Sequence, residues 1–532
     1  MKKRKIKWLN GKLIILFLMF CLLFDLQYRL NVPNNLSGID DSSYYLHSLS
    51  IAKDFDLDYS NQINFENVDP TKFYKNPKTL NFIPKHPIGV GVLASPFTFV
   101  GLFLESLNIN FGFDGNIVYF FYSLSAIFYF SLTLILFHKT EILITKKNNE
   151  NYLLMFILLF GSGIGYFSFE RFSMSHIYEV FSIILLIYIF ANKLILNEKF
   201  TYLSGVACLI PIFIRWTNYF SLVIPFLIYF VLVEQKFVDN KMFNYYFSLK
   251  FFIGLTSVPI LFLIFNYFYY GAFVFFPSQI YHNSSNVINS LNSMTSTRGY
   301  SIEFNLDFIF SLIVDFFKIL FSSEFGLLFF SPLIFLLVLK SLIYLSKSEF
   351  KIFFLNLIII LLPFFNVLIW KSTASSYGYR YLYSLIPIGF FYYLFITIKF
   401  QKIVNIFAIF SFYSLMVFES NDLTILSSQI NTFGQEHAYS ATNYLKGVIN
   451  SFTDINTIKV FGTSLLVVLC AQILIYSKII NLETIFTSND LLLSQYQKFL
   501  LYTDSFNLKI LFFVLVFLML NVLAIHRSKA FK

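Results

Sequence analysis

The sequence predicts an all-α integral membrane protein, a polytopic helical bundle of about 12–13 spans. Hydrophobic residues make up 57% of its 532 positions and charged residues only 13%, and the mean hydropathy is +0.68. These values lie far outside the range of soluble globular domains. The Lys and Arg residues behind the net charge of +10 stand in short clusters between apolar runs. This pattern orients membrane helices and does not indicate nucleic-acid binding.

The N-terminal segment MKKRKIKWLNGKLIILFLMFCLLF predicts the first helix and its orientation. Its basic start and apolar run resemble a signal peptide, but no small-residue cleavage site follows, so we expect an uncleaved helix within residues 1–30. Six Lys and Arg among the first twelve residues place this end in the cytoplasm. The chain from Asp25 onward should therefore emerge on the outer face.

Further apolar runs of about 20 residues predict the later spans. The run at 88–105 is ambiguous, because if it crossed the bilayer the Lys-bearing loops that follow would lie outside, against the positive-inside rule. A helix that lies on or dips into the outer surface keeps those loops in the cytoplasm, and the Gly and Pro residues of this run suit such a helix. The predicted spans are 116–137, 152–169, 177–192, 202–218, 219–233, 251–270, 325–346, 352–370, 381–399, 403–419, 459–477 and 508–526.

The spans divide the chain into four regions. Larger outer loops are expected at 271–324 and 420–458, and the topology of the last region stays open. The regions are a first transmembrane helix (1–30), an extracytoplasmic loop with a catalytic acid and surface helices (31–115), a transmembrane core with outer loops (116–400) and a C-terminal transmembrane region (401–532).

The stretch SGIDDSSYYLHSLSIAKDFDLDYSN, residues 37–61, opens the first outer loop with a pair of aspartates. Ser37 and Asp40 have the spacing of a capping box, and the residues after them have helical spacing. Asp40, Tyr44 and His47 should share one face of this helix, and Asp41 should lie on the next. The two acids either cap the helix and interact with its dipole, or they carry chemistry.

Isolated ionisable residues stand at the predicted outer ends of several spans. Such groups are costly at membrane depth and often mark a pathway or a site. Guanidinium groups match phosphate oxygens, so these cations could hold the phosphate of a lipid carrier, while each taken singly could equally snorkel or form a structural ion pair. The candidates for substrate binding are Lys85, Arg171, Arg215, Arg380, His176 and Glu179.

The order of these features resembles the GT-C class of polyprenyl-phosphate-sugar-dependent glycosyltransferases, which includes protein O-mannosyltransferases and lipid A aminoarabinose transferases. The motifs are the acidic pair followed by YYL, KHPIG with a later SPF, an outer SHIYE, SSEFGLLFFSPL and SSYGYRYL, within residues 8 to 400. The resemblance implies that Asp40 is the catalytic base with Asp41 in the second place, and that Lys85 meets the lipid phosphate. This chain has Asp-Asp where the family has an Asp-Glu-like pair, and Lys-His-Pro where it often has Lys-Pro-Pro.

The expected function is transfer of a sugar from a polyprenyl-phosphate-linked donor to a hydroxyl or amine of a lipid, glycan or protein acceptor. The resemblance implies a bacterial inner membrane with the active site facing outside. The activated donor supplies the energy, and neither a Walker A sequence nor a GxGxxG fingerprint is present. No cofactor is certain: five outer histidines leave a divalent metal open, but no HExxH spacing occurs and Cys21, Cys208 and Cys470 all lie in apolar stretches.

Two other functional classes share many of these features. A flippase or transporter of lipid-linked glycans would also have many spans and cationic edges, although such proteins tend to show internal repeats and charges near the middle of helices. An oligosaccharide ligase or polymerase would rely on a large later outer loop. The dependence of sugar transfer on Asp40 separates the first of these classes from a GT-C enzyme.

Overall fold

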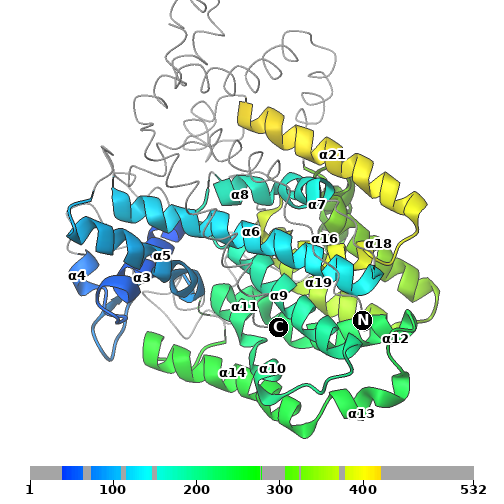
Figure 1. Cartoon of the computed structure of the whole chain (residues 1–532), viewed down its shortest axis with the longest axis horizontal. Helices are drawn as coiled ribbons and strands as arrows, with labels where there is room; N and C mark the ends of the chain where they lie inside the picture. Colours follow the sequence, from blue (N-terminus) through cyan, green and yellow to red (C-terminus); the bar gives the residue numbers. More distant parts are fainter. Residues whose placement is uncertain are drawn as a thin grey trace, which may run out of the picture.

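The computed structural model describes residues 39–63, 74–84, 86–109, 116–146, 152–169, 171–275, 277, 306–322, 325–370 and 378–420. Helices dominate these residues, and the described part contains one two-stranded sheet. Figure 1 shows the blue helices of the predicted first outer loop gathered at one end of the bundle, around the start of α6. The predicted first helix and the region after 420 lie outside the described residues.

Three helices and a small β-hairpin follow the predicted first span in the described part of the chain. Tyr74 of β1 lies opposite Ile83 of β2 in the antiparallel pair. A side chain at Gly91 would collide with Cβ of His47, so glycine permits the close approach of α5 to α3. The elements are α3 (Ile39–Lys53), α4 (Ser60–Ile63), β1 (Tyr74–Lys75), β2 (Phe82–Ile83) and α5 (Gly89–Ser106).

The bundle itself follows from residue 117 onward. Its helices are α6 (Ile117–Thr145), α7 (Tyr152–Leu159), the π-helical turn η2 (Phe160–Ile164), α8 (Gly165–Phe169), α9 (His176–Ile195), α10 (Tyr202–Val206), α11 (Leu209–Ile214), η3 (Trp216–Val223), α12 (Ile224–Glu234), η4 (Asn240–Met242), α13 (Phe243–Tyr246), α14 (Leu249–Tyr270), α16 (Leu306–Phe321), α17 (Leu327–Phe330), α18 (Pro332–Ser346), α19 (Phe350–Trp370), η6 (Arg380–Leu385), α20 (Ile386–Tyr393) and α21 (Ile398–Ser420).

The chain is an all-α, multi-pass membrane protein. Six helices in the described part are long and apolar enough to cross a bilayer, and three shorter apolar helices accompany them. The ten spans predicted between 116 and 419 all overlap helical segments, but 325–346 is interrupted at Ser331 and 381–399 is not helical at residues 394–397. The predicted spans at 459–477 and 508–526 lie outside the described residues. The six are Gly89–Ser106, Ile117–Thr145, His176–Ile195, Trp216–Glu234, Leu249–Tyr270 and Phe350–Leu368.

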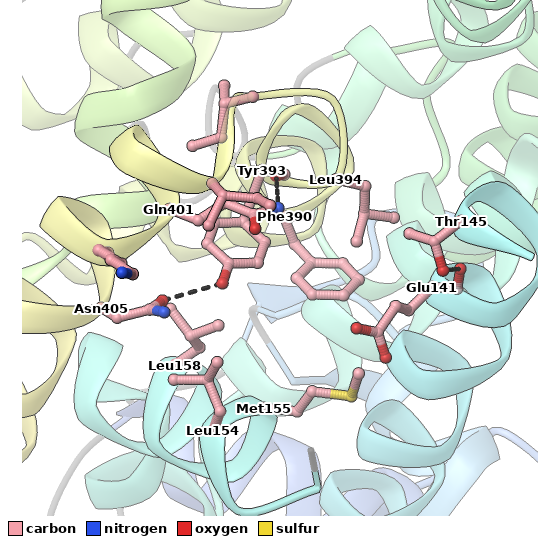
Figure 2. Close-up of a pocket in the computed structure, with 13 residues that line it drawn as sticks. Glu141, Thr145, Leu154, Met155, Leu158, Phe390, Tyr393, Leu394, Gln401 and Asn405 are labelled. Atoms are coloured by element: carbon pink, nitrogen blue, oxygen red, sulfur yellow. Dashed lines mark hydrogen bonds between the residues drawn. The ribbon is translucent and has the colours of Figure 1, made fainter. Parts of the chain in front are cut away.

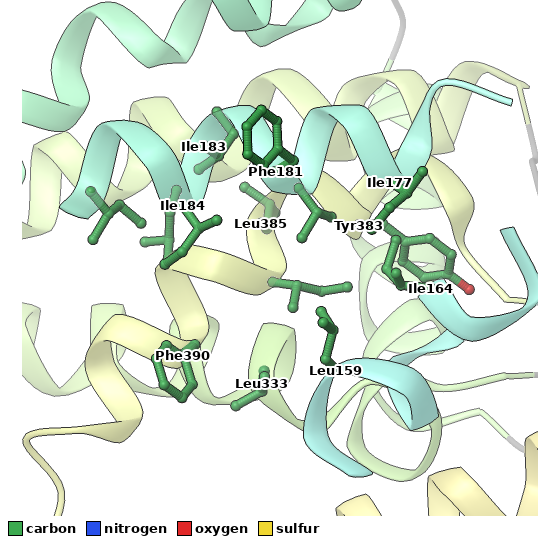
Figure 3. Close-up of a cluster of buried hydrophobic side chains, with 14 of the residues drawn as sticks. Leu159, Ile164, Ile177, Phe181, Ile183, Ile184, Leu333, Tyr383, Leu385 and Phe390 are labelled. Carbon is green, nitrogen blue, oxygen red and sulfur yellow. The ribbon is translucent and has the colours of Figure 1, made fainter. Parts of the chain in front are cut away.

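The core of the bundle surrounds α9. Figure 3 shows Ile183 and Ile184 of α9 close to Leu385 of η6, with Leu333 of α18 and Phe390 of α20 below them. Because lipid tails are as apolar as these side chains, helices associate in a membrane through close packing more than through burial from water. The aromatic content serves this packing, as in the stacked rings of Phe137 and Phe390, whose centroids lie 4.1 Å apart.

Two features of the bundle differ from the sequence interpretation. The predicted span 202–218 is broken at Arg215, which has an extended backbone between α11 and η3. Residues 271–324 were expected to form an outer loop, but α16 occupies Leu306–Phe321. Ser311, Asp315 and Lys318 recur with helical spacing and give that helix a polar side, a pattern that a search for uncharged spans passes over.

The ambiguous segment 88–105 forms α5, which stands against the first part of α6. Tyr129 of α6 donates a hydrogen bond to the Leu93 carbonyl, and Gly101 packs on Val118, so the two helices are antiparallel. The ring of Tyr178, in the first turn of α9, lies 5.2 Å from that of Tyr129. The part of α6 before Tyr129, about 18 Å long at 1.5 Å per residue, therefore extends beyond the start of α9, and α5 packs along this extension.

We expect Lys146, at the C-terminal end of α6, to lie in the cytoplasm. The reason is that an external Lys146 would also place the later Lys-bearing loops outside. A Lys146→Cys variant, in a chain whose three cysteines are replaced, should not react with an impermeant maleimide in intact cells, whereas an Asp58→Cys control in the first outer loop should react. Labelling at position 146 before permeabilisation would contradict this topology.

Candidate functional site

The first turn of α3 is anchored through Asp41. The carboxylate of Asp41 accepts a hydrogen bond from Nη2 of Arg171 at 3.1 Å and another from the hydroxyl of Ser173. The side chain of Asp41 is 5% exposed and that of Arg171 is 28% exposed. Asp41 lies near the positive end of the helix dipole, which also favours its negative charge. The α8–α9 connection and the start of α3 are thus held together by one buried carboxylate.

Asp40 and Lys85, the two residues with the strongest predicted roles, differ in how far the structure describes them. Asp40 lies one position before Asp41 in the first turn of α3, as the helical spacing predicted. Lys85 lies outside the described residues, next to His86. Their roles in proton transfer and phosphate binding stay predictions.

A second charged group surrounds Glu179, near the start of α9. Its side chain is 1% exposed, and Oε1 accepts hydrogen bonds from Arg215 at 2.8 Å and from the Ser175 hydroxyl at 2.6 Å. Nη1 of Arg215 also lies 3.3 Å from Nδ1 of His176. The same Nδ1 lies 3.5 Å from Oε1 of Glu179, so it accepts from Arg215 in one tautomer and donates to Glu179 in the other. A carboxylate buried this deeply is stable only with such partners.

Arg380 lies beside the same group, at the start of η6, which packs against α9. The Cζ atoms of Arg215 and Arg380 lie 4.6 Å and 5.2 Å from the ring centroid of Tyr381, so both guanidinium groups contact one aromatic ring. Nε of Arg380 is buried and has no hydrogen-bond partner in the described part of the chain. Among the described residues, Arg215 has a carboxylate partner and Arg380 has none.

The two charged groups share one connecting segment. Arg171 and Ser173 contact Asp41, whereas Ser175 and His176, a few residues later, contact the Glu179 group. The structure therefore brings Asp41 to Arg171, and brings His176, Glu179 and Arg215 together with Arg380 beside them. Sequence reasoning missed Ser173, Ser175 and Tyr381, although Ser175 and Tyr381 stand inside the motifs it used and Ser173 lies two residues before one of them. Small polar residues and single aromatics carry no distinguishing signal in a chain so rich in both.

His47 forms a buried polar chain on the other side of α3. Nε2 of His47 lies 2.8 Å from the His86 carbonyl oxygen, to which it must donate, so Nδ1 accepts the hydrogen bond from the Tyr59 hydroxyl at 2.7 Å. Tyr269 of α14 donates in turn to Tyr59 at 3.2 Å. Burial lowers the pKa of His47 from 6.5 to about 3, which keeps the imidazole neutral. His47 thus fixes the backbone that precedes α5.

The sequence left a metal site open because of its outer histidines. Both ring nitrogens of His47 are engaged by protein groups. Within the described ranges, no three His, Cys, Asp or Glu side chains are grouped closely enough to hold a metal ion.

Comparison with known proteins gives no family assignment. No protein-family model, curated protein or solved structure matches this chain. The likeness to GT-C glycosyltransferases therefore rests on the sequence motifs alone.

We expect His47 to make the fold sensitive to acid. Protonation favours the unfolded chain, where the pKa is 6.5, over the folded chain, where it is about 3, so this stability is present above pH 6.5 and lost as the pH falls below it. At pH 5 the loss should be about 2 kcal/mol relative to pH 7.5. Thermal unfolding of purified protein should show a smaller loss between these pH values in His47→Gln than in wild type. An equal loss in both proteins would show that other groups set the acid sensitivity.

Proposed function

We propose that the chain is a membrane glycosyltransferase of the GT-C type, which transfers a sugar from a polyprenyl-phosphate-linked donor to an acceptor hydroxyl or amine on the extracytoplasmic face. The observation that carries the proposal is Arg380, whose Nε is buried without a partner among the described residues and whose guanidinium shares the Tyr381 ring with Arg215. Arg215 and Arg380 carry two positive charges, and Glu179 supplies only one negative charge beside them. This excess of positive charge favours binding of an anion. A phosphate at a membrane edge is such an anion.

The chemistry needs a base and a means of stabilising the leaving group. The acceptor oxygen or nitrogen attacks the anomeric carbon, the bond from that carbon to the phosphate oxygen breaks, and the polyprenyl phosphate leaves with the electron pair. Asp40 takes the acceptor proton, and Arg380 with Lys85 stabilises the charge that develops on the phosphate. Arg171 and Arg215 already pair with Asp41 and Glu179. Their contribution to phosphate binding is therefore mainly longer-range electrostatic attraction and the positioning of neighbouring residues.

The location of Asp40 also supports the proposal. A base must be held within hydrogen-bond reach of the proton that it removes. Asp40 lies in a helix whose next residue is tied to the α8–α9 connection, and that connection also bears the residues around Glu179. The base and the cations are therefore carried by elements that contact one another.

We expect Asp40→Asn to reduce sugar transfer about 10²- to 10⁴-fold, the usual contribution of a general base. Asparagine retains most of the capacity to cap a helix, so a role in capping alone predicts little change in rate. The measurement is transfer from a purified polyprenyl-phosphate sugar by the full chain in detergent or nanodiscs. Asp58→Asn is the matched control, because Asp58 is another acid of the same loop and accepts a local hydrogen bond from the Ser60 backbone at 3.1 Å, at the start of α4. A folded Asp40→Asn protein with near wild-type transfer would refute the catalytic assignment of Asp40, and a wild-type chain without any transfer in this assay would favour a flippase.

We expect Arg380→Gln to raise the apparent KM for the donor about tenfold or more, with a smaller effect on the KM for the acceptor. The reason is that a hydrogen bond from a charged donor to phosphate contributes about 1.5–3 kcal/mol. Lys347→Gln, an exposed cation after α18, is the control for loss of one positive charge. An unchanged KM for the donor in Arg380→Gln would show that Arg380 does not bind the donor phosphate, and the proposal would lose its main support.

A further inference from the structure

A cavity of about 320 Å³ lies at the opposite end of the bundle from the Asp41 group (Figure 2). It is lined by the last turns of α6, by α7, by the end of α20 and by the start of α21. Glu141, which lines it, comes 19 residues after Tyr122 in α6, and Tyr122 contacts Tyr45 of α3. At 1.5 Å per residue these levels are about 28 Å apart. The cavity is therefore separate from the proposed active site, and its occupant does not depend on that proposal.

The acidic side of the cavity is formed by Glu141. Its Oε2 atom is buried and has no hydrogen-bond partner in the described ranges, and Nδ1 of His138 lies 3.6 Å away. A buried carboxylate oxygen without a hydrogen bond loses its hydration without compensation. Figure 2 shows the carboxylate directed into the space beside Phe390 and Met155. A donor brought by a ligand would satisfy it.

The opposite side of the cavity carries donors. Asn405 of α21 faces Glu141 across Phe390 and Tyr393 in Figure 2, and its Oδ1 accepts a hydrogen bond from the Tyr393 hydroxyl at 2.9 Å. This bond directs the amide nitrogen of Asn405 away from Tyr393. Lys402, three residues earlier on the same helix, also lines the cavity. An anionic group on a ligand would therefore be favoured on the α21 side.

We infer that this cavity binds a primary ammonium joined to a phosphate, the chemistry of a phosphoethanolamine headgroup, with the ammonium at Glu141 and the phosphate at Lys402 and Asn405. An anion alone would meet the Glu141 carboxylate, and a quaternary ammonium has no N–H to donate to Oε2. Apolar walls from Leu154, Leu158 and Leu394 suit an attached acyl chain. The Lys-bearing start of α21 is predicted to be cytoplasmic, which places the cavity at the level of inner-leaflet headgroups.

The test compares lipids with the same acyl chains on the purified full chain in detergent. Phosphatidylethanolamine should bind more tightly and raise the unfolding temperature more than phosphatidylcholine or phosphatidylglycerol. Glu141→Gln should weaken phosphatidylethanolamine binding about tenfold, the effect of losing one charge-assisted hydrogen bond, and should remove its advantage over phosphatidylcholine. Lys402→Gln should weaken phosphatidylethanolamine and phosphatidylglycerol alike.

Exposed residues near the same end supply the controls. Glu198→Gln and Lys399→Gln remove the same charges outside the cavity lining and should leave the lipid preference unchanged. Soluble glycerophosphoethanolamine identifies the source of the ligand: if it stabilises the wild type but not Glu141→Gln, a free headgroup suffices, and if only the lipid does so, the bilayer supplies it. Equal binding of the three lipids by the wild type, or an intact preference in Glu141→Gln, would overturn the inference.

Discussion

The buried carboxylate of Asp41 joins two parts of the chain that are 130 residues apart in sequence. Taking a carboxylate and a guanidinium out of water costs several kcal/mol each, and their attraction returns little more than this. The pair therefore contributes modestly to net stability, but removing one partner costs about 3–5 kcal/mol because the other charge is left buried. The main effect of the ion pair is to position α3, because Arg171 and Ser173 hold Asp41 at the α8–α9 connection.

The remaining contacts of α3 follow from that docking. Tyr45 packs against Tyr119 and Tyr122 of α6, with ring centroids 5.1 Å away in each case, while His47 faces the His86 carbonyl. Both sides of α3 are thus fixed, one by aromatic packing and one by a hydrogen-bonded histidine. A helix held on both sides keeps its first turn rigid, which is what a base at Asp40 would require.

The sequence predicted the fold class because each membrane span requires a long run of apolar residues, which can be read directly from a sequence. It predicted the helix α3 because the residues of that segment have helical spacing. It also predicted that Tyr44 and His47 share a face, and both contact His86. It did not predict the break at Arg215 or the shared contact of Arg215 and Arg380 with Tyr381, because these depend on how distant segments meet. The burial of His47 was missed for the same reason, since the spacing of a histidine does not reveal whether Tyr59 will cover it.

Three buried carboxylates show how differently such a group can be accommodated in the bundle. Asp41 and Glu179 are buried with guanidinium and hydroxyl donors already in place, so each is satisfied by the protein itself. Glu141 lines a cavity, its Oε2 has no hydrogen bond to any described residue, and the nearest ionisable group is the His138 imidazole at 3.6 Å. Arg380 is the cationic counterpart, because its buried Nε also has no partner there. A buried polar atom without a hydrogen bond lowers the stability of the fold, so folded proteins contain few such atoms. At both of these positions the proposed ligands would supply the missing group and offset this cost.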